Sequence, residues 1–242
     1  MSDLIEYNVE GGILGLGEFI LLEIAFYLID LEDVQQVVSL CKKTFKLKDH
    51  VRFHKSIDNK INIPISITIP TYYSEQYTKK ENEFTYTSKN FGCKTFPIDQ
   101  IITNGLYRCE FKVNKAGSSF GVMKSGLIIP FGKGCGWEPQ AKDTAYQNQE
   151  GYLYQNRSNI GGNQELKDGD IVAIEVNMAP PRTATLFTNG KQQPVFVNNI
   201  PESVQFFFTL SDNNYSTTVL SLKRLEASTS ANITGAKEVK WA

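Results

Sequence analysis

The stretch LKDGDIVAIEVNM at residues 166–178, followed by ATLFTNGK at 184–191, decides the fold of this chain. Asp168-Gly169-Asp170 has the composition of a turn. The residues after it alternate at the period of a half-buried strand, with one face made by Val172, Ile174 and Val176. Asn189-Gly190 suits a type I′ turn, because both central residues of that turn need positive φ. These two stretches therefore predict antiparallel strands joined by tight turns.

Further period-two segments lie on both sides of this hairpin. At 61–69 every odd position is isoleucine, and Pro64 predicts that this strand lies at a sheet edge. LYRCEFKV at 106–113 alternates in the same way, and short strands are predicted at 119–123, 127–131, 183–188, 194–197, 204–210 and 216–222. Because no helical pattern separates them, we expect a mainly β chain folded as a bent antiparallel β-sandwich.

The first 57 residues have a different period. Apolar residues recur at three- and four-residue steps from Leu16 to Phe45, which predicts two amphipathic helices. Asp30 stands at the N-cap of the second helix, where its carboxylate can accept from the backbone N–H of Asp33. A third short helix is predicted with Val51, Phe53 and Ile57 as its apolar side. We thus expect three parts: a small helical segment at 1–57, a sandwich at 58–225 and a flexible tail at 226–242, with Trp241 as its candidate docking residue.

Charge and composition exclude several classes of partner. The chain has 242 residues, 41% of them hydrophobic, and a formal net charge of −1, which gives no cationic field for nucleic acid or anionic lipid. Residues 1–60 hold seven bases against ten acids, a net charge of −3, so the remainder sums to +2. The longest apolar stretch, at 19–29, is shorter than the roughly twenty residues of a spanning helix.

The residue types do not favour an enzyme. The only histidines are His50 and His54, so the strand-rich region lacks the usual general base, and no cysteine or acid at ligand spacing completes a zinc set. The glycine-rich stretches 11–17 and 131–136 lack the context of a phosphate loop or a dinucleotide site. We therefore expect no catalytic residues, no metal and no cofactor.

The cysteines indicate a compartment. Four of them are widely spaced and form no CxxC pair: Cys41, Cys93, Cys109 and Cys135. Free thiols in a reducing environment are the simplest interpretation, and no basic start precedes the first apolar stretch as it would in a signal peptide. We expect an intracellular protein, cytoplasmic or nuclear.

Residues 84–222 resemble a SPRY domain. Five motifs stand in the family's order: GLYRCEFKV at 105–113, SSFGVM at 118–123, Gly136-Trp137 in a wide turn, LKDGDIVAIEVNM and the ATLFTNGK hairpin. The resemblance implies a non-catalytic sandwich that binds a short peptide or a partner domain through surface loops. Its motif residues Gly169, Asp170, Asn189 and Gly190 serve turns, not ligand contacts.

The resemblance also implies where a partner binds. The family's binding loops correspond to the segment before the first motif strand, the turn after Gly121-Val122 and the turn between the last two strands. Trp137 lines the groove in one interpretation and is a buried turn anchor in the other. The implied partner-binding residues are Tyr72, Tyr73, Lys124, Ser125, Trp137, Ser211, Asp212 and Asn213. Tyrosine suits such a role because it offers a large rigid face and one hydrogen-bonding tip.

Residues 16–45, LGEFILLEIAFYLIDLEDVQQVVSLCKKTF, are similar to an F-box. They have an LLEI-type first helix, a Leu-x-Asp break and a valine-rich second helix, but Leu16-Gly17 replaces the usual opening Leu-Pro. The resemblance implies docking on the small adaptor subunit of cullin-type ubiquitin ligases. The implied docking residues are Leu16, Phe19, Ile20, Ile24, Leu28, Leu31, Val34 and Val38. In the alternative, these residues only pack the helices together or against the sandwich.

Two functions remain open. In the first, the helices recruit a ubiquitin ligase and the SPRY-like sandwich selects its substrate. In the second, the protein is an interaction scaffold or adaptor whose helices are purely structural.

Overall fold

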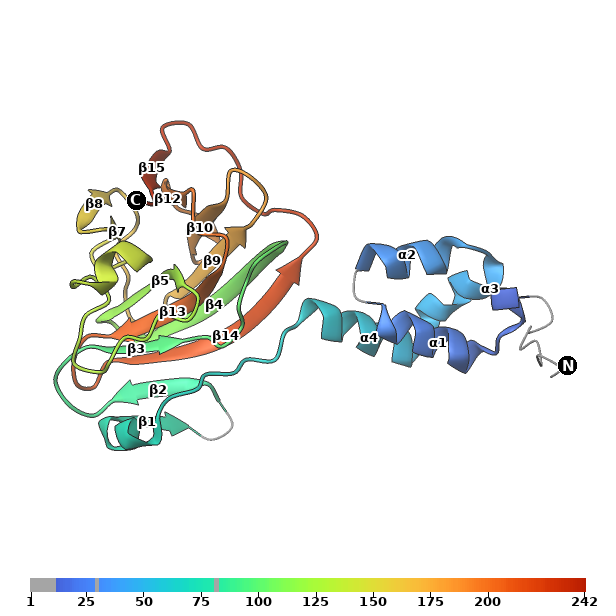
Figure 1. Cartoon of the computed structure of the whole chain (residues 1–242), viewed down its shortest axis with the longest axis horizontal. Coiled ribbons are helices and arrows are strands. Elements are labelled where there is room, and N and C mark those ends of the chain that lie inside the picture. The colour runs from blue at the N-terminus through green and yellow to red at the C-terminus, as the bar shows by residue number, and fades with distance from the viewer. Residues whose placement is uncertain (1–11, 29–30, 81–82) are drawn as a thin grey trace, which may run out of the picture. The chain divides into compact units, whose positions relative to one another are not determined.

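The computed structural model describes residues 12–28, 31–80 and 83–242. The chain consists of two compact units, Met1–Ile63 and Pro64–Ala242, which are described separately below (Figure 1). The first unit reaches beyond residue 57 because its last helix, α4, continues to Ile61.

The three predicted helices are confirmed, with three short additional helical elements in the described residues. The helical elements of the first unit are η1 (Gly12–Gly15), α1 (Glu18–Tyr27), α2 (Leu31–Ser39), α3 (Lys42–Phe45), η2 (Lys46–Asp49) and α4 (Val51–Ile61). Their shared core consists of Leu21, Leu22, Ala25, Val34, Leu47 and Phe53. An ion pair between Glu23 and Arg52 joins α1 to α4 at the surface. The predicted cap at Asp30 lies outside the described residues. No helix in the described part of the chain is long and apolar enough to cross a membrane.

The second unit is the predicted antiparallel sandwich. Its strands are β1 (Tyr77–Lys80), β2 (Thr85–Ser88), β3 (Lys94–Pro97), β4 (Leu106–Lys115), β5 (Ser118–Lys124), β6 (Thr144–Gln147), β7 (Tyr152–Gln155), β8 (Ser158–Gly161), β9 (Ile171–Asn177), β10 (Thr183–Thr188), β11 (Lys191–Gln192), β12 (Val195–Asn198), β13 (Val204–Leu210), β14 (Ser216–Leu225) and β15 (Lys237–Lys240). Two short 3₁₀ helices, η3 (Thr71–Gln76) and η4 (Gln140–Asp143), lie in its loops.

The strands of the described residues form two sheets (Figure 1). One has the order β1-β2-β14-β4-β9-β10-β12-β15, with β11 paired to β10, and the other has the order β3-β13-β5-β6-β7-β8. One side of the sandwich therefore ends in β1 and β3, and the other ends in β15 and β8. Phenylalanines fill the space between the sheets; Phe96 and Phe208 stack with ring centroids 4.8 Å apart.

The stretch that decides the fold forms as predicted. Asn189 (φ 51°) and Gly190 (φ 77°) both have positive φ in the turn between β10 and β11. The Asn189 amide also donates to the Asp170 carboxylate at 2.8 Å, so the turn before β9 is bonded to the hairpin beside it. The motif residues thus stabilise turns, as the SPRY resemblance implies.

The predicted edge strand at 61–69 is wrong. Residues 63–70 are extended and their odd-numbered isoleucines are half-buried, but they join no ladder. Asp99 replaces the missing strand partner: its N–H donates to the Ser66 carbonyl at 2.8 Å, and its carboxylate accepts from the Thr68 N–H at 2.9 Å. A side chain can bond one point of an extended chain but cannot continue a ladder, and Pro64 and Pro70 have no N–H to donate.

The predicted strand at 127–131 is also wrong. This segment has no ladder and lies against the six-stranded sheet, where Ile129 packs with Met123, Cys135 and Phe207. Its alternation of apolar residues reflects burial against the face of a sheet and not pairing within one.

The C-terminal tail has defined structure, which corrects the expectation of a flexible segment. β15 pairs in parallel with β12, and the Trp241 N–H donates to the Asn198 carbonyl at 2.9 Å. Upstream, residues 228–230 donate four groups to the carboxylate of Glu175, which is only 2% exposed. Because these contacts use backbone groups and hydroxyls, they leave no apolar period in the sequence.

Candidate functional site

Four loops meet at the side of the sandwich where β1 and β3 are the outermost strands. We call residues 70–76, 89–93, 130–133 and 211–214 the edge loops. Backbone hydrogen bonds fix them to one another and to β2: Lys89 N to Gln76 O at 3.0 Å, Gly132 N to Cys93 O at 2.7 Å and Asn214 N to Ser88 O at 2.8 Å. Loops that are distant in sequence therefore form one bonded surface.

The two predicted tyrosines have different environments. Tyr72 is 72% exposed, whereas Tyr73 is half-buried. The Tyr73 ring stacks on Phe131 at 4.2 Å, and its hydroxyl oxygen accepts from the Phe131 N–H at 3.1 Å. A hydrogen bond with Tyr73 raises the pKa of the Tyr72 phenol. Tyr72 can thus contact a partner, while Tyr73 anchors one edge loop to another.

A layer of aromatic rings lies beneath these tyrosines. The centroid of the Phe131 ring is 5.3 Å from that of Phe96 and 6.2 Å from that of Tyr77. The ring centroids of Tyr77 and Tyr86 are 5.8 Å apart. Tyr86 is fully buried, and this burial raises its pKa to about 12. The layer closes the gap between the outermost strands of the two sheets and gives the edge loops a rigid base.

The turn between β2 and β3 adds a residue that sequence reasoning missed. Phe91 lies at its middle and is 78% exposed. Lys94, the first residue of β3, is fully buried and donates from Nζ to the carbonyls of Asn90 at 2.8 Å and Gly92 at 2.7 Å. The sequence signal is an aromatic between Asn90 and Gly92 in a turn that passes from one sheet to the other.

The predicted turn residues Ser211, Asp212 and Asn213 belong to the edge loops. The Ser211 N–H donates to the Gly117 carbonyl at 3.2 Å, and the Asp212 carboxylate accepts from the Asn213 N–H at 2.7 Å. Burial lowers the pKa of Lys94, whereas the negative charge of the neighbouring Asp212 is one of the influences that raise it. The turn at 211–213 is therefore close to the β2–β3 turn, whose carbonyls Lys94 binds.

Lys124 and Ser125 lie elsewhere. β5 runs antiparallel to β13, with Ser118 opposite Leu210 and Lys124 opposite Val204. Seven residues of strand span roughly 20 Å, so Lys124 lies at the far end of β13 from the edge loops. Ser125 there pairs its hydroxyl with that of Ser203 at 2.6 Å. The structure does not join these two residues to the tyrosines.

Trp137 is 56% exposed and follows the edge loops along the wide turn. The backbone N–H of Trp137 donates to the Gly134 carbonyl at 3.1 Å. A Cβ at Gly134 would lie 3.0 Å from the indole nitrogen of Trp137, so the ring packs against that glycine. The exposure argues against the interpretation as a buried anchor.

The residues implied for F-box-like docking divide into three groups. Val34 is in the core of the helical unit, so it cannot contact a partner directly. Four others are half-buried against that core: Leu16, Ile24, Leu28 and Val38. Phe19 and Ile20 are exposed. Leu31 begins α2, and its side chain lies outside what the structure describes.

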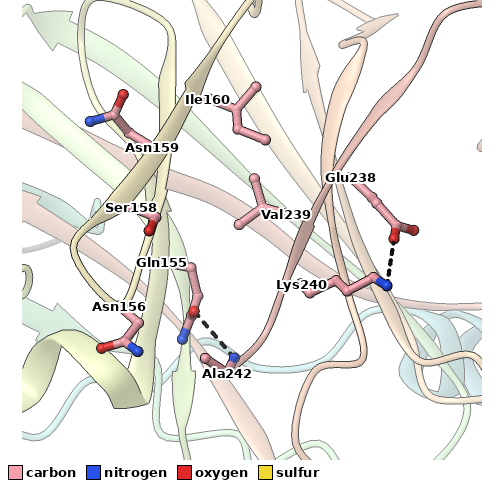
Figure 2. Close-up of a pocket in the computed structure, with 9 residues that line it drawn as sticks. All are labelled: Gln155, Asn156, Ser158, Asn159, Ile160, Glu238, Val239, Lys240 and Ala242. Atoms are coloured by element: carbon pink, nitrogen blue, oxygen red, sulfur yellow. Dashed lines mark hydrogen bonds and ion pairs between the residues drawn. The ribbon is translucent and has the colours of Figure 1, made fainter.

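A hollow lies on the opposite side of the sandwich from the edge loops, between β7–β8 and β15 (Figure 2). It has a volume of about 210 Å³, and its lining combines polar side chains with the apolar residues Ile160, Val239 and Ala242. Figure 2 shows Gln155 directed at the last residue, Ala242, whose N–H donates to the Gln155 amide oxygen at 3.2 Å. Lys240 and Glu238 pair at 3.4 Å on the same rim. Part of the hydrogen-bonding capacity of the lining is thus used within the chain itself.

No group of three or more His, Cys, Asp or Glu that could hold a metal ion occurs in the described residues.

Known proteins match this chain in structure but not in sequence. No protein-family model and no curated protein sequence matches the chain. Among solved structures, the TRIM65 PSpry domain aligns with a TM-score of 0.51 at 9% identity, covering 69% of this chain and 94% of that one. The SPRY domain of human HERC1 aligns with a TM-score of 0.48 at 13% identity, covering 64% of this chain and 98% of that one. A human SPRY domain aligns at 0.45 and 12% identity, covering 68% and 99%. With its two sheets and strand order, the second unit has the fold of a SPRY domain.

Proposed function

We propose that the sandwich is a protein-interaction module and that the edge loops bind a segment of a partner protein. The observation that carries this proposal is the exposed ring of Tyr72 on a surface of loops that hydrogen bonds fix to one another and to β2. Binding to a rigid surface loses less conformational entropy than binding to a mobile one. Exposed aromatic residues on such surfaces supply much of the binding energy at protein interfaces.

The chemistry of the sandwich cysteines favours binding over catalysis. Burial raises the pKa of the Cys135 thiol to about 12 and also raises the pKa values of Cys93 and Cys109. These thiols stay protonated at neutral pH, and a protonated thiol is a poor nucleophile. We therefore propose a non-catalytic role.

The test is affinity purification of the full-length chain from its own cells, followed by mass spectrometry. We expect Tyr72→Ser to remove the sandwich partner while leaving the melting temperature unchanged. Tyr152→Ser is the matched control, because Tyr152 is also exposed but belongs to β7 on the other side of the sandwich. A partner that is retained by Tyr72→Ser, or lost equally with the control, would contradict binding at the edge loops.

A second function is supported by the surface of α1. This helix buries Leu21, Leu22 and Ala25 but exposes Phe19, Ile20 and Tyr27, so it is apolar on more than its core side. Large exposed apolar residues gathered on one helix are typical of interaction sites. We propose that this face docks on the adaptor subunit of a cullin-type ubiquitin ligase, as the F-box resemblance implies. The sandwich would then raise the effective concentration of its partner near the ligase. Because cullin-type ligases act inside the cell, this second function goes with the proposal of an intracellular location.

Purified adaptor subunit tests the second function directly. We expect it to bind the full-length chain and to lose at least tenfold in affinity with Phe19→Asp/Ile20→Asp. Leu40→Asp serves as the control, since Leu40 is exposed but follows α2. If wild type and both variants fail to bind the adaptor alike, the alternative stands: a SPRY-like scaffold whose helices are structural.

A further inference from the structure

The β2–β3 turn pairs a buried charge with an exposed aromatic ring. Lys94 has no exposed surface, although lysine is among the residues least often fully buried. Phe91, three residues earlier, is 78% exposed. Each side chain thus has the environment that its chemistry least favours, and the two are linked through one short turn.

Hydrogen bonds explain the link. The Lys94 ammonium holds the carbonyls of Asn90 and Gly92 at 2.8 and 2.7 Å, one on each side of Phe91. The buried Ser88 hydroxyl adds a second bond to the Asn90 carbonyl at 3.0 Å. With both flanking carbonyls directed inward at one ammonium, the residue between them is at the apex of the turn.

The rest of the turn is fixed as well. Gly92 has φ +98°, a conformation that other residues rarely adopt. A Cβ at Gly92 would be 3.6 Å from the Gly132 Cα, so the turn packs closely against another edge loop. The backbone carbonyl of Cys93 accepts a hydrogen bond from the Gly132 N–H at 2.7 Å on the same side of the turn. The conformation around Phe91 is therefore determined from several directions.

This arrangement has an energetic cost that the fold alone does not require. Removing an ammonium from water is energetically unfavourable, and hydrogen bonds recover this cost only in part. Burial accordingly lowers the pKa of Lys94. A methionine of similar length would fill the same space without that cost, but it could not hold two carbonyls. The lysine instead fixes the turn in a conformation that exposes one aromatic ring. Such preorganisation raises the affinity for a binding partner.

We propose that Phe91 is an anchor residue for the partner and that Lys94 is the positioning residue that presents it. This inference rests on the proposed binding function of the edge loops. The partner segment that fits is a peptide with a bulky apolar side chain, which packs on the Phe91 ring. The exposed Lys89 begins the same turn, and its charge favours an acidic residue beside that apolar side chain.

A phage-displayed library of random 12-residue peptides, panned on the full-length chain, supplies the probe. Selected peptides are synthesised and titrated against wild type and variants by fluorescence anisotropy. We expect a shared bulky apolar residue, at least a tenfold loss of affinity with Phe91→Ser, and no change with Ile101→Ser. Ile101 is a matched control because it is exposed but lies next to the bridge between Ile102 and Val204, at the far end of β13.

Lys94→Met separates positioning from a merely structural role. We expect affinity to fall threefold or more, the amides of 89–93 to exchange faster, and the melting temperature to stay the same or rise, because the buried charge is gone. A lower melting temperature with unchanged affinity would overturn the positioning role. In that case Lys94 supports the fold and not the binding surface.

The outcomes distinguish this inference from the function it rests on. Peptides that lose affinity with Tyr72→Ser but bind Phe91→Ser normally would overturn the inference and leave the proposed function intact. Peptides insensitive to both substitutions, or a library that yields no binder, would overturn both.

Discussion

Substitution of Glu175 by alanine should release residues 226–236 of the C-terminal tail, before β15, without unfolding the sandwich. The Glu175 carboxylate accepts from the Ser228 hydroxyl at 2.5 Å, from the Ser230 N–H at 3.3 Å, and from both the N–H and the hydroxyl of Thr229. Arg108 lies 3.9 Å away, close enough to balance part of its charge. Glu175 is thus the main attachment point between the tail and β9.

The magnitude follows from these four donors. Hydrogen bonds to a charged group contribute about 1.5–3 kcal/mol each. The sum is an upper bound, because the released donors are at the surface and can bond to water, and because burying the carboxylate has its own cost. We expect a net loss of about 2–4 kcal/mol, confined to the tail. At 1.4 kcal/mol per factor of ten, the protection of tail amides from hydrogen exchange should fall about 30- to 700-fold.

Hydrogen exchange measured by mass spectrometry checks this result. Peptides covering 226–236 should lose protection in Glu175→Ala, while peptides covering β9, β10 and β15 keep it. Glu165→Ala is the control, since Glu165 is an exposed glutamate just before the same strand. Unchanged protection of the tail, or an equal loss throughout the sandwich, would refute the assignment of Glu175 as its local anchor.

Three further substitutions test other parts of the fold. Tyr86→Phe should remove part of the alkaline instability: burial raises the pKa of Tyr86 from 10.0 to about 12, so wild type should lose about 2 kcal/mol more than the variant between pH 10 and pH 12, measured by urea unfolding. Stability that does not diverge across that range would contradict this burial effect. Gly121→Ala should cost about 3 kcal/mol, because its Cβ would overlap the Ala145 carbonyl oxygen, and should lower the melting temperature by about 6–12 °C; an unchanged melting temperature would show that β6 can move away. Val34→Ala should destabilise the helical unit by about 2 kcal/mol, visible as earlier loss of the helical circular dichroism signal, while sandwich tryptophan fluorescence melts as in wild type.

Local chemistry made much of the sandwich predictable. The turn at Asn189-Gly190 depends on two residues that tolerate positive φ, and neither needs a distant partner. The alternation in 171–177 likewise records which face of β9 is buried, and it correctly predicted the strand. Motifs in which each residue's role is local can be identified without coordinates.

The failures share a different cause. Ile65, Ile67 and Ile69 alternate as a strand would, but their segment bonds to Asp99, more than 30 residues away in the chain. Periodicity reports burial on one side, and it does not report whether a neighbouring strand exists. The same limit explains the segment at 127–131, which is buried against a sheet face.

The candidate site was predictable only in part. Tyr72 was found because the SPRY resemblance identifies the segment that contains it. Phe91 was missed because its exposure depends on Lys94, and a lysine beside a turn normally indicates a solvated loop. The separation of Tyr72 from Tyr73 depends on Phe131, which joins their loop only in the folded chain.

The parallel pairing of β15 with β12 has a consequence for solubility. A sheet that ended at β12 would present the free backbone groups of Val195–Asn198, an apolar edge on which another chain could add a strand. β15 covers that edge and replaces it with a strand whose exposed residues are Lys237, Glu238 and Lys240. Charged side chains on an outer strand discourage edge-to-edge aggregation. The last residues of the chain, which have no hydrophobic pattern of their own, thus protect the β12 edge of the larger sheet from pairing with another copy of the chain.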